Sequence, residues 1–428
     1  MSKLWANRRE ILMDELLNKC TMAKDAAQKM ITVSTVVKDN ALKAIADALV
    51  ENADEIIAAN KEDVENAVKN GIRKAMIDRL TLTKDRICAM ADGVREVAAL
   101  NDPIGEVINM TKRPNGLVIG KKRVPMGVIG IIYEARPNVT ADAAALCLKT
   151  SNACILRGGS EAIKSNTAIM RIMQGAAYSA GIPEGMLNVI EDTSRETATR
   201  LMKMNGYIDM LIPRGGKGLI KSVVENATVP VVETAAGNCH VYVDKYADLY
   251  MAENIVINAK VQRPSVCNAA ETLLIDKDIA DEFVPIIFEK LKSLGVEIRA
   301  DEAARNIYSD GICAATEDDY YTEYNDYILA VKIVDGVDSA IKHINKYNTK
   351  HSEAIVTENY SNSQKFLEEV DAAAVYVNAS TRFTDGFEFG FGAEIGISTQ
   401  KMHARGPMGL EALTSVKYIV YGSGQVRG

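Results

Sequence analysis

Apolar residues recur at three- and four-residue steps through about the first hundred residues of the chain. Between about 34 and 70 these positions are Leu42, Ile45, Ala46, Leu49, Val50, Ala53, Ile56 and Ile57. This spacing places apolar side chains on one face of an α-helix. The pattern continues over 72–100 and stops at Asn101-Asp102-Pro103, a sequence that ends helices. We therefore predict a mostly helical segment up to about residue 100.

Residues 105–127 follow a different pattern, with loose alternation of apolar and polar side chains. Pro-Asn-Gly at 114–116 supplies a turn in the middle of this segment. Alternation on both sides of a turn is typical of a β-hairpin, so we predict a two-stranded arm here.

Short and nearly unbroken apolar runs then alternate with helix-length segments such as 165–180, 280–294 and 361–370. The first set of runs is 128–132, 153–156, 187–190, 210–212 and 229–232. The second set is 272–275, 328–334, 354–357 and 373–377. This alternation is expected of parallel sheets covered on both faces, so we predict two doubly wound α/β domains. Residues 415–421 are β-branched and aromatic and indicate a last strand.

Composition narrows the function. The 428 residues carry a net charge of −7 without a basic stripe, which argues against nucleic acid and leaves a small-molecule partner. No run approaches the roughly 20 apolar residues that cross a bilayer, and the charged N-terminus does not suit a signal peptide, so we expect a cytoplasmic protein. Seven cysteines without Cys-x-x-Cys spacing indicate reduced thiols, and four scattered histidines make a metal centre unlikely.

Three loops rich in Gly, Pro and Arg follow strand-like runs, where α/β proteins bind ligands. After 128–132, Asn138 either donates its amide to a developing oxyanion or helps to cap the next helix. After 153–156, Arg157-Gly158-Gly159 either binds a phosphate or forms a simple turn. After 210–212, Pro213-Arg214-Gly215-Gly216 opens a helix whose amides suit a pyrophosphate, although it matches no common nucleotide fingerprint.

Cys267 is the candidate nucleophile, because it lies in the polar, proline-broken loop Gln-Arg-Pro-Ser-Val-Cys-Asn (262–268). We group this loop with those that follow strands. Arg263 supplies a charge that favours a thiolate. Cys239 is the competitor, because His240 beside it could act as a base. Adjacent residues on an extended chain point to opposite faces, which weakens that pairing.

Six segments together resemble the gamma-glutamyl phosphate reductases, also called glutamate-5-semialdehyde dehydrogenases, of the aldehyde dehydrogenase superfamily. These segments are 124–140 (VPMGVIGIIYEARPNVT), 155–161 (ILRGGSE), 207–216 (YIDMLIPRGG), 262–268 (QRPSVCN), 375–386 (VYVNASTRFTDG) and 403–414 (HARGPMGLEALT). The resemblance covers nearly the whole chain from about residue 20, and it identifies Cys267 as the nucleophile.

The resemblance implies an aldehyde dehydrogenase-like α/β fold in three parts. These are a cofactor-binding domain (1–105 and 128–240), a catalytic domain (241–405) and a β oligomerisation arm (106–127 and 406–428). It also implies NADPH-dependent reduction of L-glutamyl 5-phosphate to L-glutamate 5-semialdehyde and phosphate, the second step of proline biosynthesis. We expect a homo-oligomer whose substrate comes from a separate glutamate 5-kinase, associated or not.

Roles for individual residues follow from the same resemblance. Cys267 and Asn138 are implied as catalytic residues, and no metal is implied. The implied cofactor contacts are Arg157, Gly158, Gly159, Pro213, Arg214, Gly215, Gly216 and Glu323. The candidates for substrate recognition are Arg136, Arg263, Ser380, Thr381 and Arg382. His240 is an alternative to Arg263 for the leaving phosphate.

Glu233 leaves one alternative open, because it aligns with the acid that activates water in hydrolytic aldehyde dehydrogenases. A reductase of acyl phosphates has no use for that water, so we interpret Glu233 as a relic, a substrate contact or a strand-end acid. An ordinary hydrolytic aldehyde dehydrogenase is the second hypothesis, and a non-catalytic protein of the same fold is the third.

Overall fold

The computed structural model describes residues 2–234 and 236–427, without the side chains of residues 2–14, 74 and 75, and it begins with five helices. Ser34 and Thr83 start the second and fifth helices by accepting hydrogen bonds from Val37 N–H and Arg86 N–H. The predicted helical segment is thus confirmed. Its helices are α1 (Ser2–Met30), α2 (Thr35–Glu51), α3 (Ala53–Lys69), α4 (Lys74–Leu80) and α5 (Lys84–Ala99).

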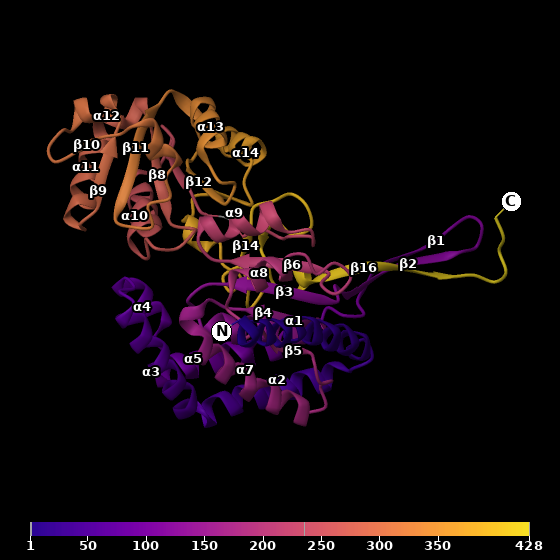
Figure 1. Ribbon diagram of the computed structural model, residues 1–428. Helices are drawn as coiled ribbons and strands as arrows, with labels where there is room; N and C mark the ends of the chain where they lie inside the picture. The colour runs from indigo at the N-terminus through magenta and orange to yellow at the C-terminus, as the bar shows by residue number, and fades with distance from the viewer. Residues whose placement is uncertain (1, 235, 428) are drawn as a thin grey trace. The chain divides into compact units, whose positions relative to one another are not determined.

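A parallel sheet of four strands follows, in the order β5-β4-β3-β6 (Figure 1). Its strands are β3 (Val128–Tyr133), β4 (Ala153–Arg157), β5 (Leu187–Val189) and β6 (Met210–Arg214). Its helices are α6 (Asn138–Lys149), α7 (Ile163–Ser179), α8 (Arg195–Leu201) and α9 (Lys217–Asn226), with the 3₁₀ turn η1 (Ser160–Ala162). Strands β3 to β6 agree with the predicted runs.

The fifth run of the first set, 229–232, was predicted wrongly as a strand. Only an isolated bridge forms there, between Val231 and Leu211. Leu211 N–H donates to the carbonyl of Pro230, and Val232 N–H donates to the carbonyl of Leu211. Pro230 itself has no N–H to donate, so the pairing does not extend into a ladder.

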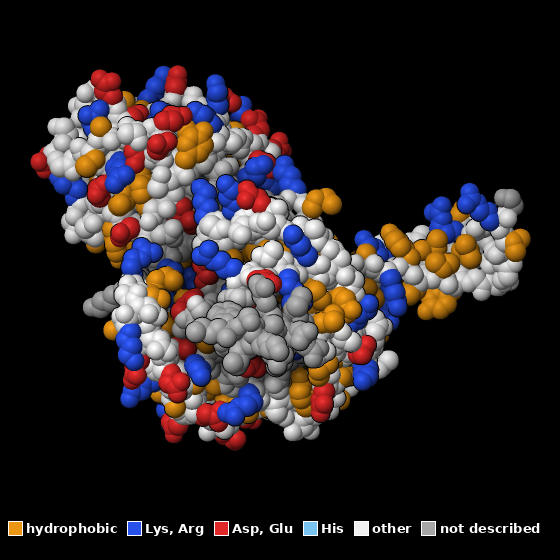
Figure 2. All heavy atoms as spheres, in the orientation of Figure 1, with side chains coloured by type: hydrophobic (Ala, Val, Ile, Leu, Met, Phe, Trp, Pro, Cys, Tyr) orange, Lys and Arg blue, Asp and Glu red, His pale blue; other side chains and the backbone are white. Residues whose placement is uncertain are grey.

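The predicted hairpin forms β1 (Val107–Lys112) and β2 (Val118–Pro125), and the last strand is β16 (Thr414–Tyr421). The three make an antiparallel ribbon in the order β1-β2-β16. Hydrophobic side chains are exposed along the ribbon (Figure 2), namely Val107, Ile108, Met110, Val416, Tyr418, Val420 and Tyr421. Both outer strands keep an unpaired edge within the described chain, so the ribbon is suited to pairing with another surface.

A second parallel sheet of the described chain has seven strands in the order β10-β9-β11-β8-β7-β12-β13. Its strands are β7 (Cys239–Val243), β8 (Ala270–Asp276), β9 (Glu297–Ala300), β10 (Cys313–Ala314), β11 (Ile328–Val334), β12 (Ser352–Val356) and β13 (Ala374–Val377). Its helices are α10 (Leu249–Val261), α11 (Ala280–Ser293), α12 (Glu302–Ile307), α13 (Gly336–Tyr347) and α14 (Tyr360–Glu369). Shorter elements are η2 (Lys277–Ile279), η3 (Glu317–Tyr321), η4 (Thr381–Phe383), η5 (Leu410–Leu413), β14 (Ile397–Ser398) and β15 (Gly406–Pro407).

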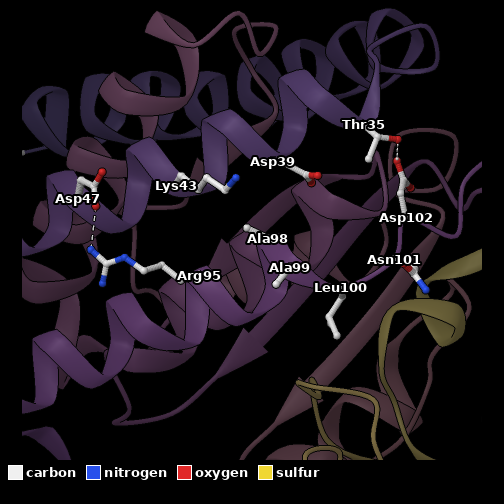
Figure 3. A pocket seen from close by; sticks show the side chains of 10 residues that line it. All are labelled: Thr35, Asp39, Lys43, Asp47, Arg95, Ala98, Ala99, Leu100, Asn101 and Asp102. Carbon is white, nitrogen blue, oxygen red and sulfur yellow. Dashed lines mark hydrogen bonds and ion pairs between the residues drawn. The ribbon is translucent and has the colours of Figure 1, made fainter.

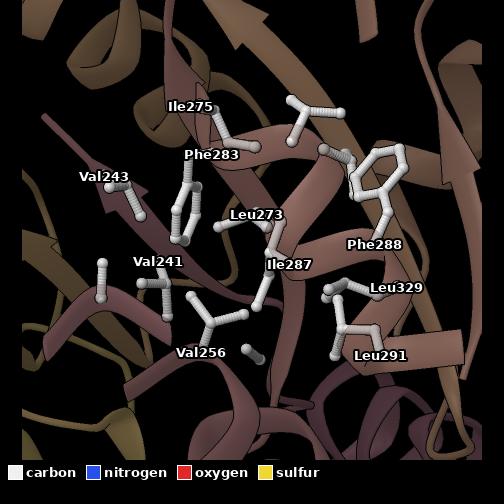
Figure 4. Close-up of a cluster of buried hydrophobic side chains, with 14 of the residues drawn as sticks. Val241, Val243, Val256, Leu273, Ile275, Phe283, Ile287, Phe288, Leu291 and Leu329 are labelled. Atoms are coloured by element: carbon white, nitrogen blue, oxygen red, sulfur yellow. The ribbon is translucent and has the colours of Figure 1, made fainter. Parts of the chain in front are cut away.

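Alternate residues of the central strands enter two different cores, one on each face of this sheet. Val241 and Val243 of β7 join Phe283 and Phe288 of α11 in one core (Figure 4). Tyr242, between the two valines, joins residues of α13 and α14 in the other core. Because side chains alternate along a strand, helices cover both faces, which confirms the predicted α/β arrangement.

Strand β7 was missed by the sequence analysis, although it lies inside the sheet between β8 and β12. His240 interrupts its apolar pattern, and this polar side chain is fully buried. Glu353 of the neighbouring β12 accepts a hydrogen bond from His240 N–H at 2.8 Å, and its Oε2 lies 2.9 Å from His240 Nδ1. The partner that makes this polar residue compatible with a buried strand lies more than a hundred residues away in the sequence.

The described chain divides into two compact units. The N-terminal unit comprises residues 1–233, 390–396 and 408–428, and the C-terminal unit comprises residues 234–389 and 397–407. Thr234 belongs to the second unit because it bridges Ser398. The ribbon of β1, β2 and β16 falls within the N-terminal unit.

Candidate active site

The functional loops of the N-terminal unit lie at the carboxyl edge of its sheet. Strand β3 pairs with β4 on one side and with β6 on the other, and all three run in parallel. The chain therefore leaves β3 and β6 in opposite directions, which makes a topological switch point, the usual ligand-binding position in such sheets. The predicted residues at this edge are Arg136, Asn138, Arg157, Gly158, Gly159, Pro213, Arg214, Gly215 and Gly216.

A cavity of about 780 Å³ opens at this edge, and Arg157, Gly159 and Ser160 contribute to its lining. The Arg157 guanidinium donates to the carbonyls of Thr193 and Ser194. Its buried Nε has no hydrogen-bond partner among the described residues. Arg157 is thus fixed at the wall of the cavity by carbonyls, with the carboxylates of Glu161 and Asp192 near enough to interact with its charge.

Two carboxylates accept hydrogen bonds from backbone amides of the loops after β3 and β6. Gly216 N–H, where α9 begins, donates to Glu134 Oε2 at 2.8 Å. Ala135 N–H donates to Glu161 Oε1 at 2.7 Å. A side chain at Gly215 would collide with the Glu134 carboxylate. The amides at this edge therefore already hold anionic oxygens in the structure.

Pro137 is the N-cap residue of α6 and makes no side-chain capping hydrogen bond, and Asn138 is the first residue of the helix. Its amide instead donates to Asp142 Oδ2 at 3.0 Å, one turn further along the helix. Burial raises the pKa of Asp142 to about 6, and the hydrogen bond from Asn138 opposes that rise. An amide nitrogen carries two N–H groups, so one remains available after this bond. Asn138 thus lies at the helix start that the sequence predicted, and its catalytic role stays a prediction.

The loop of Cys267 differs from the three loops of the N-terminal unit, because it follows helix α10 and precedes strand β8. Grouping it with loops that follow strands was therefore wrong. Cys267 lies at the amino edge of the second sheet, beside the starts of β7 and β8. Cys267 is partly exposed, whereas the next residue, Asn268, is buried.

Asn268 anchors the loop to the segment 380–384. Its Nδ2 donates to the carbonyls of Arg382 and Thr384, at 3.1 and 3.0 Å. Thr381 Oγ1 donates to the carbonyl of Asn268 at 2.7 Å, and Arg382 also bonds Asn268 Oδ1. Ser380 caps the 3₁₀ turn η4 by accepting from Arg382 N–H. In this structure the side chains of Ser380 and Thr381 thus support the loop.

Gly237 lies directly behind Cys267. A Cβ atom at this position would overlap the carbonyl group of Cys267, so only glycine allows the two backbones to approach so closely. Gly237 N–H donates to Glu323 Oε1 at 2.7 Å. Glu323 therefore lies beside the Cys267 loop, in the same unit as the nucleophile candidate.

Two arginines give the loop its positive charge. Burial lowers the pKa of Arg382, and the neighbouring charge of Arg263 lowers it further, while Cys267 acts in the opposite direction. Arg263 is exposed, and Arg382 Nε donates to Gln262 at 2.9 Å. Both guanidiniums thus act on the surroundings of Cys267, as a thiolate or a phosphate would require.

Cys239, the competitor, is a poor nucleophile. It is fully buried, and burial raises the pKa of its thiol well above the ordinary range. His240 does not serve it as a base, because His240 bonds Glu353. His240 is itself fully buried within β7, which does not suit a contact with phosphate.

The predicted site residues fall into two sets, and each set is brought together within its own unit. Cys267, Arg263, Glu323, Ser380, Thr381 and Arg382 belong to the C-terminal unit. Arg136, Asn138 and the residues around Arg157 and Gly215 belong to the N-terminal unit. Asp142, Gly237 and Asn268 were not predicted from the sequence. Asn268 stood in the segment 262–268 that carries the nucleophile candidate, but only three-dimensional contacts show the roles of these residues.

A second cavity of the N-terminal unit, about 640 Å³ in volume, lies between α2 and α5 (Figure 3). Asp47 pairs with Arg95 at 2.8 Å, and Thr35 donates to Asp102 at 2.7 Å. Two pairs of its polar side chains thus satisfy each other, and we assign the cavity no ligand. No group of metal-binding side chains occurs among the described residues. Within the same part of the chain, no helix is long and apolar enough to cross a bilayer.

The model of the aldehyde dehydrogenase family matches residues 5–306. An acetylating aldehyde dehydrogenase from Geobacillus thermoglucosidasius shares the fold, with a TM-score of 0.70 at 19% identity over 97% of this chain and 98% of its own. The fold, together with the match to the family model, therefore defines an oxidoreductase of the aldehyde dehydrogenase type.

More similar proteins narrow the group. The gamma-glutamyl phosphate reductase of Clostridium novyi is 63% identical over 96% of this chain and 99% of its own. That of Caldicellulosiruptor bescii is 61% identical over 97% of this chain and 100% of its own. The crystal structure of the Thermotoga maritima reductase superposes with a TM-score of 0.95, at 52% identity over 97% of this chain and 100% of that chain. The chain belongs to the aldehyde dehydrogenase family and, within it, to the gamma-glutamyl phosphate reductases.

Proposed function

We propose that this enzyme reduces L-glutamyl 5-phosphate to L-glutamate 5-semialdehyde with release of phosphate, through a thioester on Cys267. The observation that carries the proposal is the Cys267 loop, whose backbone is fixed by Asn268 and Gly237 and whose surroundings are positive. The names of relatives above 60% identity give the substrate. The reaction is the second step of proline biosynthesis, and we place it in the cytoplasm.

The cofactor we propose is NADPH, and the N-terminal unit fits it. Arg157 at the cavity wall suits the phosphate on the adenosine ribose, with Gly158 and Gly159 beside it. The loop Pro213-Arg214-Gly215-Gly216 suits the pyrophosphate, since Gly216 N–H already holds the carboxylate of Glu134. Glu323 is proposed for the nicotinamide ribose. When bound, NADPH supplies the hydride of the reduction.

The enzyme's own groups act on the acyl phosphate. The Cys267 thiolate attacks the acyl carbon, and phosphate leaves with the electron pair of the broken C–O bond. The second N–H of Asn138 and the backbone N–H of Cys267 stabilise the tetrahedral oxyanion. Reduction of the thioester gives a thiohemiacetal on Cys267, which releases the aldehyde and regenerates the thiolate.

Substrate recognition is assigned to charged groups near the loop. Arg263 is exposed and acts on Cys267's surroundings, so we propose it for the leaving phosphate or the α-carboxylate. Arg136, Ser380, Thr381 and Arg382 complete the proposed recognition set. Thr381 and Arg382 already bond Asn268, so their contribution includes holding the loop that receives the substrate.

The proposal extends to partners. The ribbon of β1, β2 and β16, with its exposed apolar side chains, is proposed as the contact surface of a homo-oligomer. The acyl phosphate is unstable in water, so a glutamate 5-kinase must supply it nearby, in a stable complex or by diffusion.

The decisive experiment runs the reaction backwards with glutamate semialdehyde, measuring NADPH formation with and without phosphate. We expect turnover to require phosphate or arsenate, to favour NADP over NAD, and to fall more than about 10⁴-fold in Cys267→Ala. Equal rates without phosphate would favour a hydrolytic aldehyde dehydrogenase with Glu233 as the base. Unchanged turnover in Cys267→Ala would reject the thioester.

A further inference from the structure

A second thiol, that of Cys239, makes a hydrogen bond with the backbone of the candidate nucleophile Cys267. Cys239 Sγ donates to the backbone carbonyl of Cys267 at 3.2 Å. The two residues are separated by a helix and a loop in the sequence, and they meet because β7 and β8 start side by side. Cys239 is fully buried, whereas the Cys267 residue is partly exposed.

The Cys239 thiol is a hydrogen-bond donor that stays protonated. Burial raises the pKa of this thiol well above its ordinary range. A protonated thiol donates, whereas a thiolate would repel the carbonyl oxygen. Because Gly237 packs against the same carbonyl group, the Cys267 carbonyl has little freedom to choose another partner.

The hydrogen bond belongs to a closed ring around the loop. On one side, Asn268 Nδ2 donates to the carbonyl of Thr384, and Thr384 Oγ1 lies 2.6 Å from Ser352 Oγ. Ser352 Oγ in turn lies 2.8 Å from His351 Nδ1, and His351 Nδ1 lies 3.8 Å from Cys239 Sγ. Burial lowers the pKa of His351 to about 4, so the ring is neutral at physiological pH. One network of hydrogen bonds therefore fixes both Cys239, which contacts the Cys267 carbonyl, and Asn268, which follows Cys267 in the chain.

We propose that Cys239 is a positioning residue for the reaction, which holds the Cys267 backbone so that the thiolate and the Cys267 N–H keep their place relative to the acyl carbon. This rests on the proposed function of Cys267 as nucleophile. A displacement of about 1 Å in a reacting group typically lowers a rate on the order of 100-fold. Cys239 acts through Cys267 and contacts no substrate.

The test compares Cys239→Ala with Cys239→Ser, because a serine hydroxyl can donate to the same carbonyl. Cys239→Val, an apolar residue without a donor, serves if the alanine variant does not fold. Cys20→Ala is the matched control, since Cys20 is an equally buried thiol of α1 in the other unit. Turnover is measured with glutamate semialdehyde, phosphate and NADP, and NADP binding is measured separately by fluorescence.

We expect kcat to fall about 10- to 100-fold in Cys239→Ala, with KM and Kd for NADP within about twofold. Cys239→Ser should recover kcat to within about fivefold of the parent enzyme, and Cys20→Ala should keep it. A general loss of structure would instead raise the Kd for NADP or lower Tm equally in the serine variant.

The inference is overturned if the non-donor variant keeps kcat within twofold, or if Cys239→Ser is no more active than that variant. Cys267→Ala in the same assay distinguishes a failure of the proposed role of Cys239 from a failure of the proposed nucleophile. If Cys267→Ala is inactive and Cys239→Ala is unaffected, only the role of Cys239 fails. If Cys267→Ala remains active, the proposed nucleophile fails and the role of Cys239 fails with it.

Discussion

The two parallel sheets carry their candidate sites at opposite edges. In the N-terminal unit the loops follow β3, β4 and β6, so they lie at the carboxyl edge, where helices begin. In the C-terminal unit the nucleophile loop precedes β8 and lies at the amino edge, where helix α10 ends. The helix starts at the carboxyl edge thus present backbone N–H groups, whereas the helix end at the amino edge presents backbone carbonyls.

This difference explains how each loop is held. At the carboxyl edge, the N–H groups of Ala135 and Gly216 are available to anions, and carboxylates already occupy them. At the amino edge, the carbonyl end of α10 carries partial negative charge, which disfavours a thiolate. The positive charges of Arg263 and Arg382 offset it. Side chains, rather than helix amides, must therefore fix the backbone around Cys267.

The largest expected effect comes from filling the space behind the nucleophile. In Gly237→Ala the new methyl group would overlap the Cys267 carbonyl. A methyl group is fixed directly to the backbone and the carbonyl is part of it, so neither can rotate away. We expect turnover to fall more than about 10³-fold, because the loop must shift by more than the roughly 1 Å that already costs about 100-fold. Steady-state kinetics measures the loss, and NADP binding to the other unit should remain.

Gly175→Ala is the control for this substitution, because a side chain there meets nothing within 4 Å and Gly175 is an exposed residue of α7. It should keep nearly full activity. If Gly237→Ala is as active as Gly175→Ala, the contrast between a loop held by close backbone packing and loops that offer amides does not hold.

The two edges also differed in how far the sequence predicted them. Apolar runs followed by glycine mark the carboxyl edge within a few residues, so Arg157, Gly159 and Gly216 were placed on the correct loops. The amino edge depends on partners far away in the sequence. Asn268 is held by Thr381 and Arg382, which are more than a hundred residues distant. No local pattern indicates such contacts.

Errors in the fold have equally physical causes. The run 229–232 is apolar enough for a strand, but Pro230 prevents a ladder. Strand β7 lacks an apolar pattern because His240 is accommodated by Glu353 of another strand. Patterns report which side chains prefer burial, whereas backbone pairing and paired polar groups decide which segments enter the sheet.

A smaller loss is expected from the carboxyl edge. Asn138→Ala removes one proposed oxyanion donor, so kcat should fall about 100- to 1000-fold while KM for NADP changes little. Asn226→Ala is the matched control, because Asn226 is exposed and its amide donates to the carbonyl of Ser222 in its own helix. If kcat falls less than about threefold, the proposed role of Asn138 as an oxyanion donor is wrong, and cofactor binding is the role that remains for the carboxyl edge.

Arg157 sharpens the comparison on the cofactor side. In Arg157→Gln the charge at the cavity wall is lost, so kcat/KM with NADPH should fall about tenfold while that with NADH changes less than about twofold. The ratio of the two values in one assay is the measurement. Arg171→Gln, which removes an exposed arginine of α7, should leave the ratio unchanged. Equal losses with both cofactors would contradict a contact with the ribose phosphate.

The smallest effect concerns stability, through the carboxylate that holds Asn138. Burial raises the pKa of Asp142 to about 6, against about 3.9 in an unfolded chain. Between these values the folded state retains the proton that the unfolded state has lost, so stability falls as pH rises through this window. Asp142→Asn removes the charge and keeps an oxygen that can accept from Asn138. We expect the variant to be more stable than the parent by on the order of 1 to 3 kcal/mol at pH 7.5, and equally stable below about pH 4.

Urea unfolding at pH 4, 6 and 7.5 measures this difference, with the exposed Asp25→Asn as the control. A variant less stable than its parent at pH 7.5 would mean that the hydrogen bond from Asn138 and the charge of Arg214 outweigh the burial of Asp142. The carboxyl edge would then resemble the amino edge, with a functional group held by a favourable charged contact. If the variant is more stable, Asp142 keeps its charge at a cost in stability, which is expected of a residue that orients a catalytic amide.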